Sequence, residues 1–181
     1  SNRGTGHFGT GTYFLSSDDW LKSSTFYKDR PLHKVSFDGY NLYRPSNASE
    51  AKRLHDALKV VNKLANIWKP GMTYEQAYAK LDTDLIAAMS DLPFKEYIGP
   101  EKAFAAISPI LEGIHKYVKG NTEWWSDKSR DSASTMVMKQ LGYDGIDVRH
   151  IPSYDNTEYG SVIYDLKTSK QALYSFPANI A

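Results

Sequence analysis

Residues 144–166 read DGIDVRHIPSYDNTEYGSVIYDL, and this stretch decides the fold class. Asp144–Arg149 and Gly160–Leu166 are short runs rich in β-branched side chains, a pattern typical of strands. The polar segment Pro152–Glu158 joins them and is expected to be a loop. The stretch therefore predicts two strands near the end of the chain.

Two further strand candidates lie near the start of the chain. Thr10–Leu15 and Leu32–Phe37 have the period-2 pattern of half-buried strands, and Asp38-Gly39 marks a turn directly after the second. The sheet is therefore expected to combine segments from both ends of the chain.

A block of three amphipathic helices is expected between about residues 47 and 120. Apolar residues recur there with the helical period of 3.6. Asn47 with Glu50, and Thr73 with Gln76, have the spacing of capping boxes and predict the starts of the first two helices. The second helix is expected to run to about Leu92.

The order of these elements predicts an α+β fold. One shorter helix, about Ser132–Leu141, follows the helical block, and Gly142 is expected to end it in a left-handed cap. The plan is a split mixed or antiparallel sheet interrupted by an all-helical insertion of about residues 47–120. Residues 1–181 are expected to form a single domain, because no linker or repeat divides them.

Composition excludes several kinds of site. The 181 residues include 22 basic and 21 acidic side chains and no cysteine, so a thiol nucleophile, a disulfide and a Cys-based zinc site are impossible. The five histidines form no metal-binding spacing, and His55 and His115 are expected at helix surfaces or caps. From this spacing we expect no bound metal. No apolar run is long enough to span a bilayer, so we expect no membrane segment and a cytoplasmic protein.

Two segments contain residue types that suit ligand binding or catalysis. Gly4–Gly9 matches the G-x-G-x-x-G pattern but lacks the strand before it and the helix after it, so it is not a dinucleotide fingerprint of the Rossmann type. It is either a flexible leader into a hairpin or a place where the backbone approaches a ligand closely. Glu158, before an apolar strand, suits general-base work or stabilisation of a sugar cation; the alternative is a solvated loop carboxylate.

Taken together, three segments resemble the ADP-ribosyltransferase superfamily, in the His-Tyr-Glu branch of poly(ADP-ribose) polymerases and diphtheria toxin. Gly9–Phe14 resembles the family's G-x-G-x-Y-F run, and Thr157–Tyr159 with Val162–Leu166 resembles its catalytic-glutamate strand. Ser134-Thr135 and the segment Leu141–Ile146 are similar to a helix and strand of phage and bacterial members. The resemblance covers about fifty residues and leaves the helical insertion unmatched.

The resemblance implies a fold and a site. It implies a split sheet of ADP-ribosyltransferase type that binds NAD as co-substrate, without metal. Tyr13 would stack on nicotinamide, with Gly9, Gly11 and Thr12 beside the dinucleotide. Glu158 would hold the nicotinamide ribose and stabilise its cation as nicotinamide leaves.

The sequence departs from the family at two places. The family's opening strand, with its His or Arg, has no counterpart before the glycines in this sequence. Arg3 or His7 could substitute in cofactor binding, although neither has a strand before it. Otherwise the sequence starts part-way into the domain, another chain completes the sheet, or catalysis has been lost. Asn156 stands two residues before Glu158, where arginine-directed members carry Glu, which leaves the acceptor open.

The function implied is transfer of ADP-ribose from NAD to a macromolecule. The acceptor is expected to be a protein, with a nucleic acid as the alternative, and a toxin or effector could act in a host cytoplasm. Two other functions remain open: an NAD glycohydrolase toxin, and a catalytically silent module that binds a partner. Trp124-Trp125 could grip the acceptor or be buried against the helices.

Overall fold

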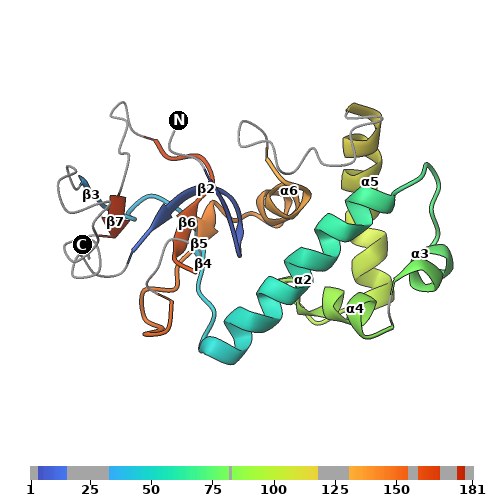
Figure 1. The fold of residues 1–181 in the computed structure, drawn as a ribbon, viewed down its shortest axis with the longest axis horizontal. Helices are drawn as coiled ribbons and strands as arrows, with labels where there is room; N and C mark the ends of the chain where they lie inside the picture. Colours follow the sequence, from blue (N-terminus) through green and yellow to red (C-terminus); the bar gives the residue numbers. More distant parts are fainter. Residues whose placement is uncertain are drawn as a thin grey trace, which may run out of the picture.

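The protein has an α+β fold in which a mixed sheet and a group of helices lie at opposite ends of the molecule, with α6 between them (Figure 1). The prediction of an α+β class is confirmed. The structure is a computed structural model, and it describes residues 4–15, 33–81, 83–117, 131–154, 159–167 and 175–177.

Within the described residues the sheet has seven strands, in the order β3-β7-β2-β6-β5-β4, with β1 paired to β2 off this path. The strands are β1 (Gly4–Gly6), β2 (Gly9–Phe14), β3 (His33–Val35), β4 (Leu42–Tyr43), β5 (Gly145–Ile146), β6 (Ser161–Ile163) and β7 (Ser175–Pro177).

The central strand β6 joins the two ends of the chain. It pairs antiparallel with β2 on one side and with β5 on the other. β7 pairs parallel with both β2 and β3, and β4 pairs parallel with β5, so the sheet is mixed. A sheet built from both chain ends is therefore confirmed, although β1, β4 and β7 were not among the predicted strands.

The strand predicted at Asp144–Arg149 is shorter than expected, because only Gly145–Ile146 pairs in the ladder. The N–H of Asp147 still donates to the carbonyl of Tyr43 at 2.9 Å, but the two N–H groups after it bond to side chains. The N–H of Val148 donates to Ser161 Oγ at 2.9 Å, and that of Arg149 donates to Asp147 Oδ1 at 3.0 Å. These bonds satisfy the backbone outside the sheet and end β5 early.

The helices are α2 (Ala48–Ile67), α3 (Tyr74–Lys80), α4 (Thr83–Ala87), the 3₁₀ helix η1 (Ala88–Asp91), α5 (Gly99–Tyr117) and α6 (Ala133–Gln140). The prediction of one second helix running to Leu92 is wrong. That segment is divided into α3, α4 and η1, because the backbone of Leu81 is extended, with φ −104° and ψ 153°, and ends α3.

Both predicted helix starts have the expected caps, with one difference. Thr73 and Gln76 form a reciprocal capping box at α3. At α2, Asn47 Oδ1 accepts from the N–H of Glu50 at 2.9 Å, but the Glu50 carboxylate accepts from the N–H of Ser46 at 2.8 Å. Each device satisfies N–H groups that the first turn leaves without a helical partner.

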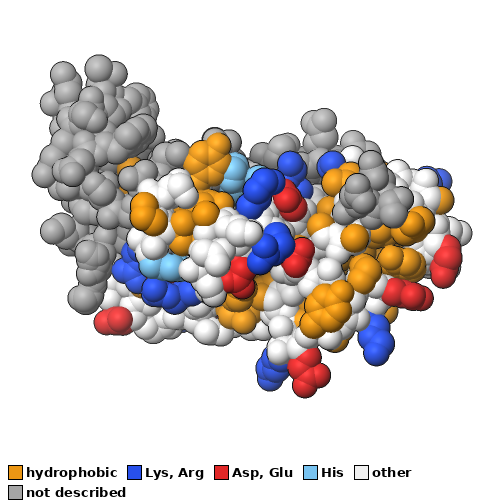
Figure 2. Space-filling model, turned by 90° about the horizontal axis from the view of Figure 1, so that it is seen from below, with side chains coloured by type: hydrophobic (Ala, Val, Ile, Leu, Met, Phe, Trp, Pro, Cys, Tyr) orange, Lys and Arg blue, Asp and Glu red, His pale blue; other side chains and the backbone are white. Residues whose placement is uncertain are grey.

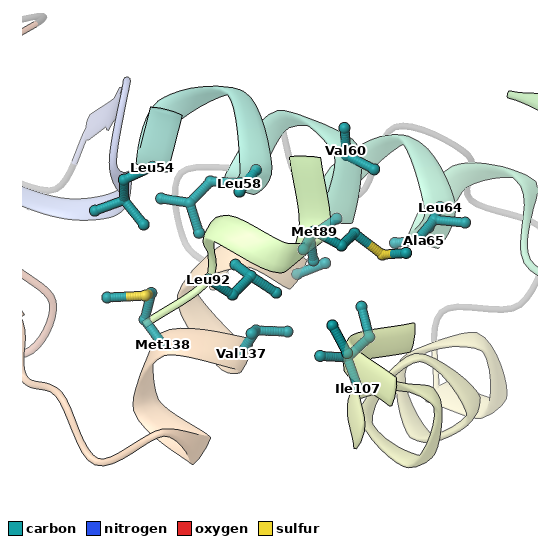
Figure 3. Packing of buried hydrophobic residues seen from close by; sticks show 14 of the residues in the cluster. Leu54, Leu58, Val60, Leu64, Ala65, Met89, Leu92, Ile107, Val137 and Met138 are labelled. Atoms are coloured by element: carbon teal, nitrogen blue, oxygen red, sulfur yellow. The ribbon is translucent and has the colours of Figure 1, made fainter. Parts of the chain in front are cut away.

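The main core lies where α2 meets η1, α5 and α6 (Figure 3). Leu54, Leu58 and Leu64 on α2 are almost completely buried, as are Val137 and Met138 on α6. Burial of such side chains is the main contribution to the free energy of folding. Helix α6 thus joins the helices to the sheet and fixes their relative position.

Candidate functional site

Two of the segments singled out in the sequence contain neighbouring strands of the sheet, β2 and β6. β2 and β6 lie about 150 residues apart in the sequence and pair antiparallel. The opposed residues are Thr12 with Ile163, Tyr13 with Val162, and Phe14 with Ser161. The structure therefore brings together the run containing Tyr13 and the strand that follows Glu158.

His7 occupies the turn between β1 and β2 and packs between two aromatic rings. Its imidazole is stacked on that of His55 from α2, with 3.7 Å between ring centroids and 7° between planes. The ring of Tyr159 meets His7 edge-on at 4.0 Å. The hairpin, α2 and the segment just before β6 therefore converge at His7.

Two more aromatic rings extend this contact. The ring centroid of Tyr154 lies 6.1 Å from that of Tyr159 and 5.9 Å from that of Phe8. The side chain of Phe8 is completely buried. We call His7, His55, Tyr154 and Tyr159 the aromatic cluster. All four side chains are half-buried, so solvent reaches part of each of them.

His55 was expected at a helix surface or cap, and its imidazole is half-buried where it contacts His7 in the aromatic cluster. Burial lowers the pKa of His55 to about 4, and the charges of His7 and Lys59 act in the same direction. His55 is therefore neutral at pH 7. A neutral imidazole can stack on a second ring without the cost of burying a charge.

Tyr13 holds the hairpin together through its hydroxyl group. The N–H of Phe8 donates to Tyr13 Oη at 3.0 Å, and the hydroxyl donates to the carbonyl of Gly9 at 2.7 Å. A Cβ on Gly6 would lie 2.6 Å from the tyrosine ring, so glycine is needed there for the ring to cover the strand. Burial also raises the pKa of Tyr13 above its ordinary value.

Gly9 and Gly11 have a packing explanation in the structure. A Cβ on Gly9, whose φ is +114°, would collide with Thr135 of α6. A Cβ on Gly11 would lie 2.6 Å from the carbonyl oxygen of Ile163. The space beside both Cα atoms is filled by protein, so close approach of a ligand is not what requires these glycines. Thr12, the residue after Gly11, is buried as well.

A buried group of hydroxyls anchors α6 to β2. The N–H of Thr10 donates to Thr135 Oγ1 at 2.8 Å, and Ser132 Oγ lies 3.0 Å from the same atom. Ser132 also caps α6 by accepting from the N–H of Thr135 at 3.2 Å. Each of these buried polar atoms has a hydrogen-bond partner, as burial requires. The hydroxyls therefore have a structural role, which is to attach α6 to β2.

Sequence reasoning missed a second polar group, which lies at the ends of β4 and β5. Arg44 follows β4, Asp147 follows β5, and Arg149 lies two residues further. Both arginines bond to the buried Asp147 carboxylate. One signal could have found the group: Asp147 is an acidic residue between two apolar ones in a predicted strand, where it requires a partner.

Several predicted site residues fall outside the described part of the chain. These are Arg3, Trp124, Trp125, Asn156 and Glu158. Tyr159, the residue that follows Glu158, is described and lies in the aromatic cluster.

No group of three or more His, Asp or Glu side chains that could hold a metal ion occurs among the described residues. None of the helices in that part of the chain is long and apolar enough to cross a membrane. Comparison of the sequence with protein-family models found no match, and comparisons with the curated proteins and with the solved structures found none either.

Proposed function

We propose that the protein is an NAD-dependent ADP-ribosyltransferase that cleaves the nicotinamide N-glycosidic bond and transfers ADP-ribose to a macromolecular acceptor. The observation that carries this proposal is the ring contact between His7 and Tyr159. It joins the glycine-rich hairpin to the residue next to Glu158, while β2 pairs with β6 behind it. The sequence segments that resemble the family thus lie together.

The aromatic cluster suits the rings of a dinucleotide. Its half-buried side chains offer flat faces and edges, on which a nicotinamide or adenine ring stacks in offset or edge-on geometry. Lys52 and Lys59 are close enough to act electrostatically on Tyr154 and His55, respectively. Their positive charges, partly offset by Asp56, favour the approach of an anionic diphosphate.

Glu158 would supply the carboxylate for the reaction. As the bond from the ribose C1′ to nicotinamide breaks, its electron pair leaves with nicotinamide and positive charge develops on the ribose. A nearby carboxylate stabilises that charge and can take the proton of the attacking nucleophile. The nucleophile bonds to C1′, giving nicotinamide and an ADP-ribosylated acceptor.

Release of nicotinamide from NAD tests the proposal. The parent protein should release nicotinamide, and Glu158→Gln should lower turnover about a hundredfold or more with NAD affinity largely kept. Glu96→Gln, at an exposed position of the helical half, is the matched control and should keep full turnover. Equal turnover by Glu158→Gln and the parent would show that Glu158 is not the catalytic carboxylate.

Two further measurements separate the related functions. Labelled NAD incubated with a cell extract should mark a protein or a nucleic acid if the enzyme is a transferase, whereas a glycohydrolase yields only free ADP-ribose. A thermal shift with millimolar NAD reports binding without catalysis, because ligand at a hundred times its Kd stabilises a protein by about 2.7 kcal/mol. No shift and no cleavage would favour a silent partner-binding module.

A further inference from the structure

Asp147 holds two arginine side chains at the ends of β4 and β5. Arg149 binds it through a fork, with Nε donating to Oδ1 and Nη2 donating to Oδ2, both at 2.9 Å. Arg44 Nη1 donates to the same Oδ2 at 2.8 Å. The carboxylate is therefore shared between two guanidinium groups.

The charges in this group do not balance. Two arginines carry one positive charge more than the single aspartate can neutralise. Burial raises the pKa of Asp147, but the hydrogen bonds from Arg149 and the charges of both arginines outweigh burial, so its pKa is lowered and the group stays ionised. The surplus positive charge therefore persists at neutral pH.

The surplus charge is accessible and firmly placed. The side chain of Arg44 is 55% exposed, whereas that of Asp147 is 2% exposed, so solvent reaches the group from the arginine side. Arg149 is fixed a second time, because its guanidinium carbon lies 4.3 Å from the ring centroid of Phe37. Figure 2 shows Lys and Arg side chains gathered around a histidine at the sheet end of the molecule.

A guanidinium has five N–H donors, and most of those on Arg44 make no bond to Asp147. Donors held in a fixed fork match the oxygens of a phosphate group better than a flexible ammonium does. We propose that Arg44 and Arg149, positioned by Asp147, form a binding site for a phosphate group of a nucleotide. Asp147 acts through the arginines and is a positioning residue.

The proposed phosphate site lies at the same end of the sheet as the start of β6. Ser161, the first residue of β6, accepts from the N–H of Val148, directly after Asp147. Tyr159 of the aromatic cluster precedes Ser161 by two residues. The phosphate can therefore belong to NAD itself or to a second, phosphate-bearing ligand, and the site does not depend on NAD cleavage.

Calorimetric titration with inorganic pyrophosphate tests the site directly, at constant ionic strength. The parent protein should bind pyrophosphate, and Arg44→Gln should weaken binding about tenfold or more. Lys102→Gln removes the same charge from an exposed position on α5 and should bind like the parent. If Arg44→Gln unfolds, Arg44→Lys should bind more weakly than Lys102→Gln.

Competition with ADP-ribose identifies the source of the phosphate. Displacement of pyrophosphate by ADP-ribose would place the site within the dinucleotide site, and simultaneous binding of both would assign it to a second ligand. The proposal is overturned if the parent protein does not bind millimolar pyrophosphate, or if the arginine variant that folds binds as tightly as Lys102→Gln. The pyrophosphate titration and the ADP-ribose competition measure binding and do not depend on NAD cleavage. Their outcome is therefore the same whether or not the Glu158 variant has lost cleavage.

Discussion

The imidazole rings of His7 and His55 lie face to face, with 3.7 Å between centroids and 7° between planes. One ring comes from a glycine-rich turn and the other from the second turn of α2, so the stack ties the β1–β2 hairpin to the helical half. Two protonated imidazoles at this distance would repel each other. The contact therefore opposes protonation of His55 and makes stability depend on pH.

We expect the free energy of unfolding to fall as the pH is lowered from 6.5 toward 4. The pKa of His55 is about 4 in the folded protein and 6.5 in the unfolded chain, so the unfolded state binds the proton first and is favoured by acid. Urea denaturation at several pH values measures this. His55→Phe keeps a ring and should reduce the slope, whereas His115→Gln on α5 should not. An unchanged slope in His55→Phe would contradict the assignment.

Gly11→Ala should destabilise the protein by about 2 kcal/mol or more. The added methyl group would meet the backbone of β6, which cannot move aside without breaking the sheet. Gly113→Ala is the control, because it lies in α5 with nothing within 4 Å of the added Cβ. For Gly113→Ala we expect the free energy of unfolding to rise by about 0.5–1 kcal/mol, because alanine has a higher helix propensity than glycine. Thermal denaturation of both variants checks the difference, and similar melting temperatures would refute it.

Tyr13→Phe separates the roles of the hydroxyl and the ring. Loss of the hydroxyl leaves the N–H of Phe8 and the carbonyl of Gly9 without their partner, which costs about 1–2 kcal/mol. Tyr78→Phe, at a 42% exposed position, should be neutral. If the ring of Tyr13 also stacks on nicotinamide, Tyr13→Phe keeps NAD cleavage and Tyr13→Ala loses it. Equal stability of Tyr13→Phe and the parent would show that the hydroxyl bonds contribute little.

The sequence predicted those helices and strands whose formation depends on residues close together in the chain. The Thr73 capping box and the Ser132 helix start were found because the cap and the first turn are close in the sequence. β2 was predicted from the period-2 pattern assigned to Thr10–Leu15, but five of its six residues are buried, so it is not the half-buried strand that this pattern indicates. β1 was missed because Gly4–Gly6 has no alternating side chains, and its pairing comes from the hairpin with β2.

The site depends on contacts that no local pattern contains. His7 and His55 are 48 positions apart, and their stacking follows from how α2 packs beside the hairpin. Sequence reasoning could name His7 from the resemblance, but it assigned His55 to a helix surface or cap. The bonds from Arg44 to Asp147 likewise span 103 positions. Sequence reasoning singled out Gly9 and Gly11 as places where a ligand approaches the backbone, whereas their close contacts with α6 and β6 depend on the tertiary fold.

Asp147→Asn should be the most destabilising of these single substitutions, at about 3 kcal/mol or more. The variant leaves Arg44 and Arg149 side by side without the carboxylate that neutralises one of them. Asp91→Asn is the control, since Asp91 is exposed and its contact with Arg53 is 4.0 Å long. Urea denaturation should show a large loss of stability for Asp147→Asn and almost none for Asp91→Asn.

High sodium chloride should reduce the difference in the free energy of unfolding between these two variants, because it screens the repulsion between the two arginines. A loss below about 1 kcal/mol would mean that the carboxylate contributes little to holding the arginines, and it would remove the physical basis for a preformed phosphate site.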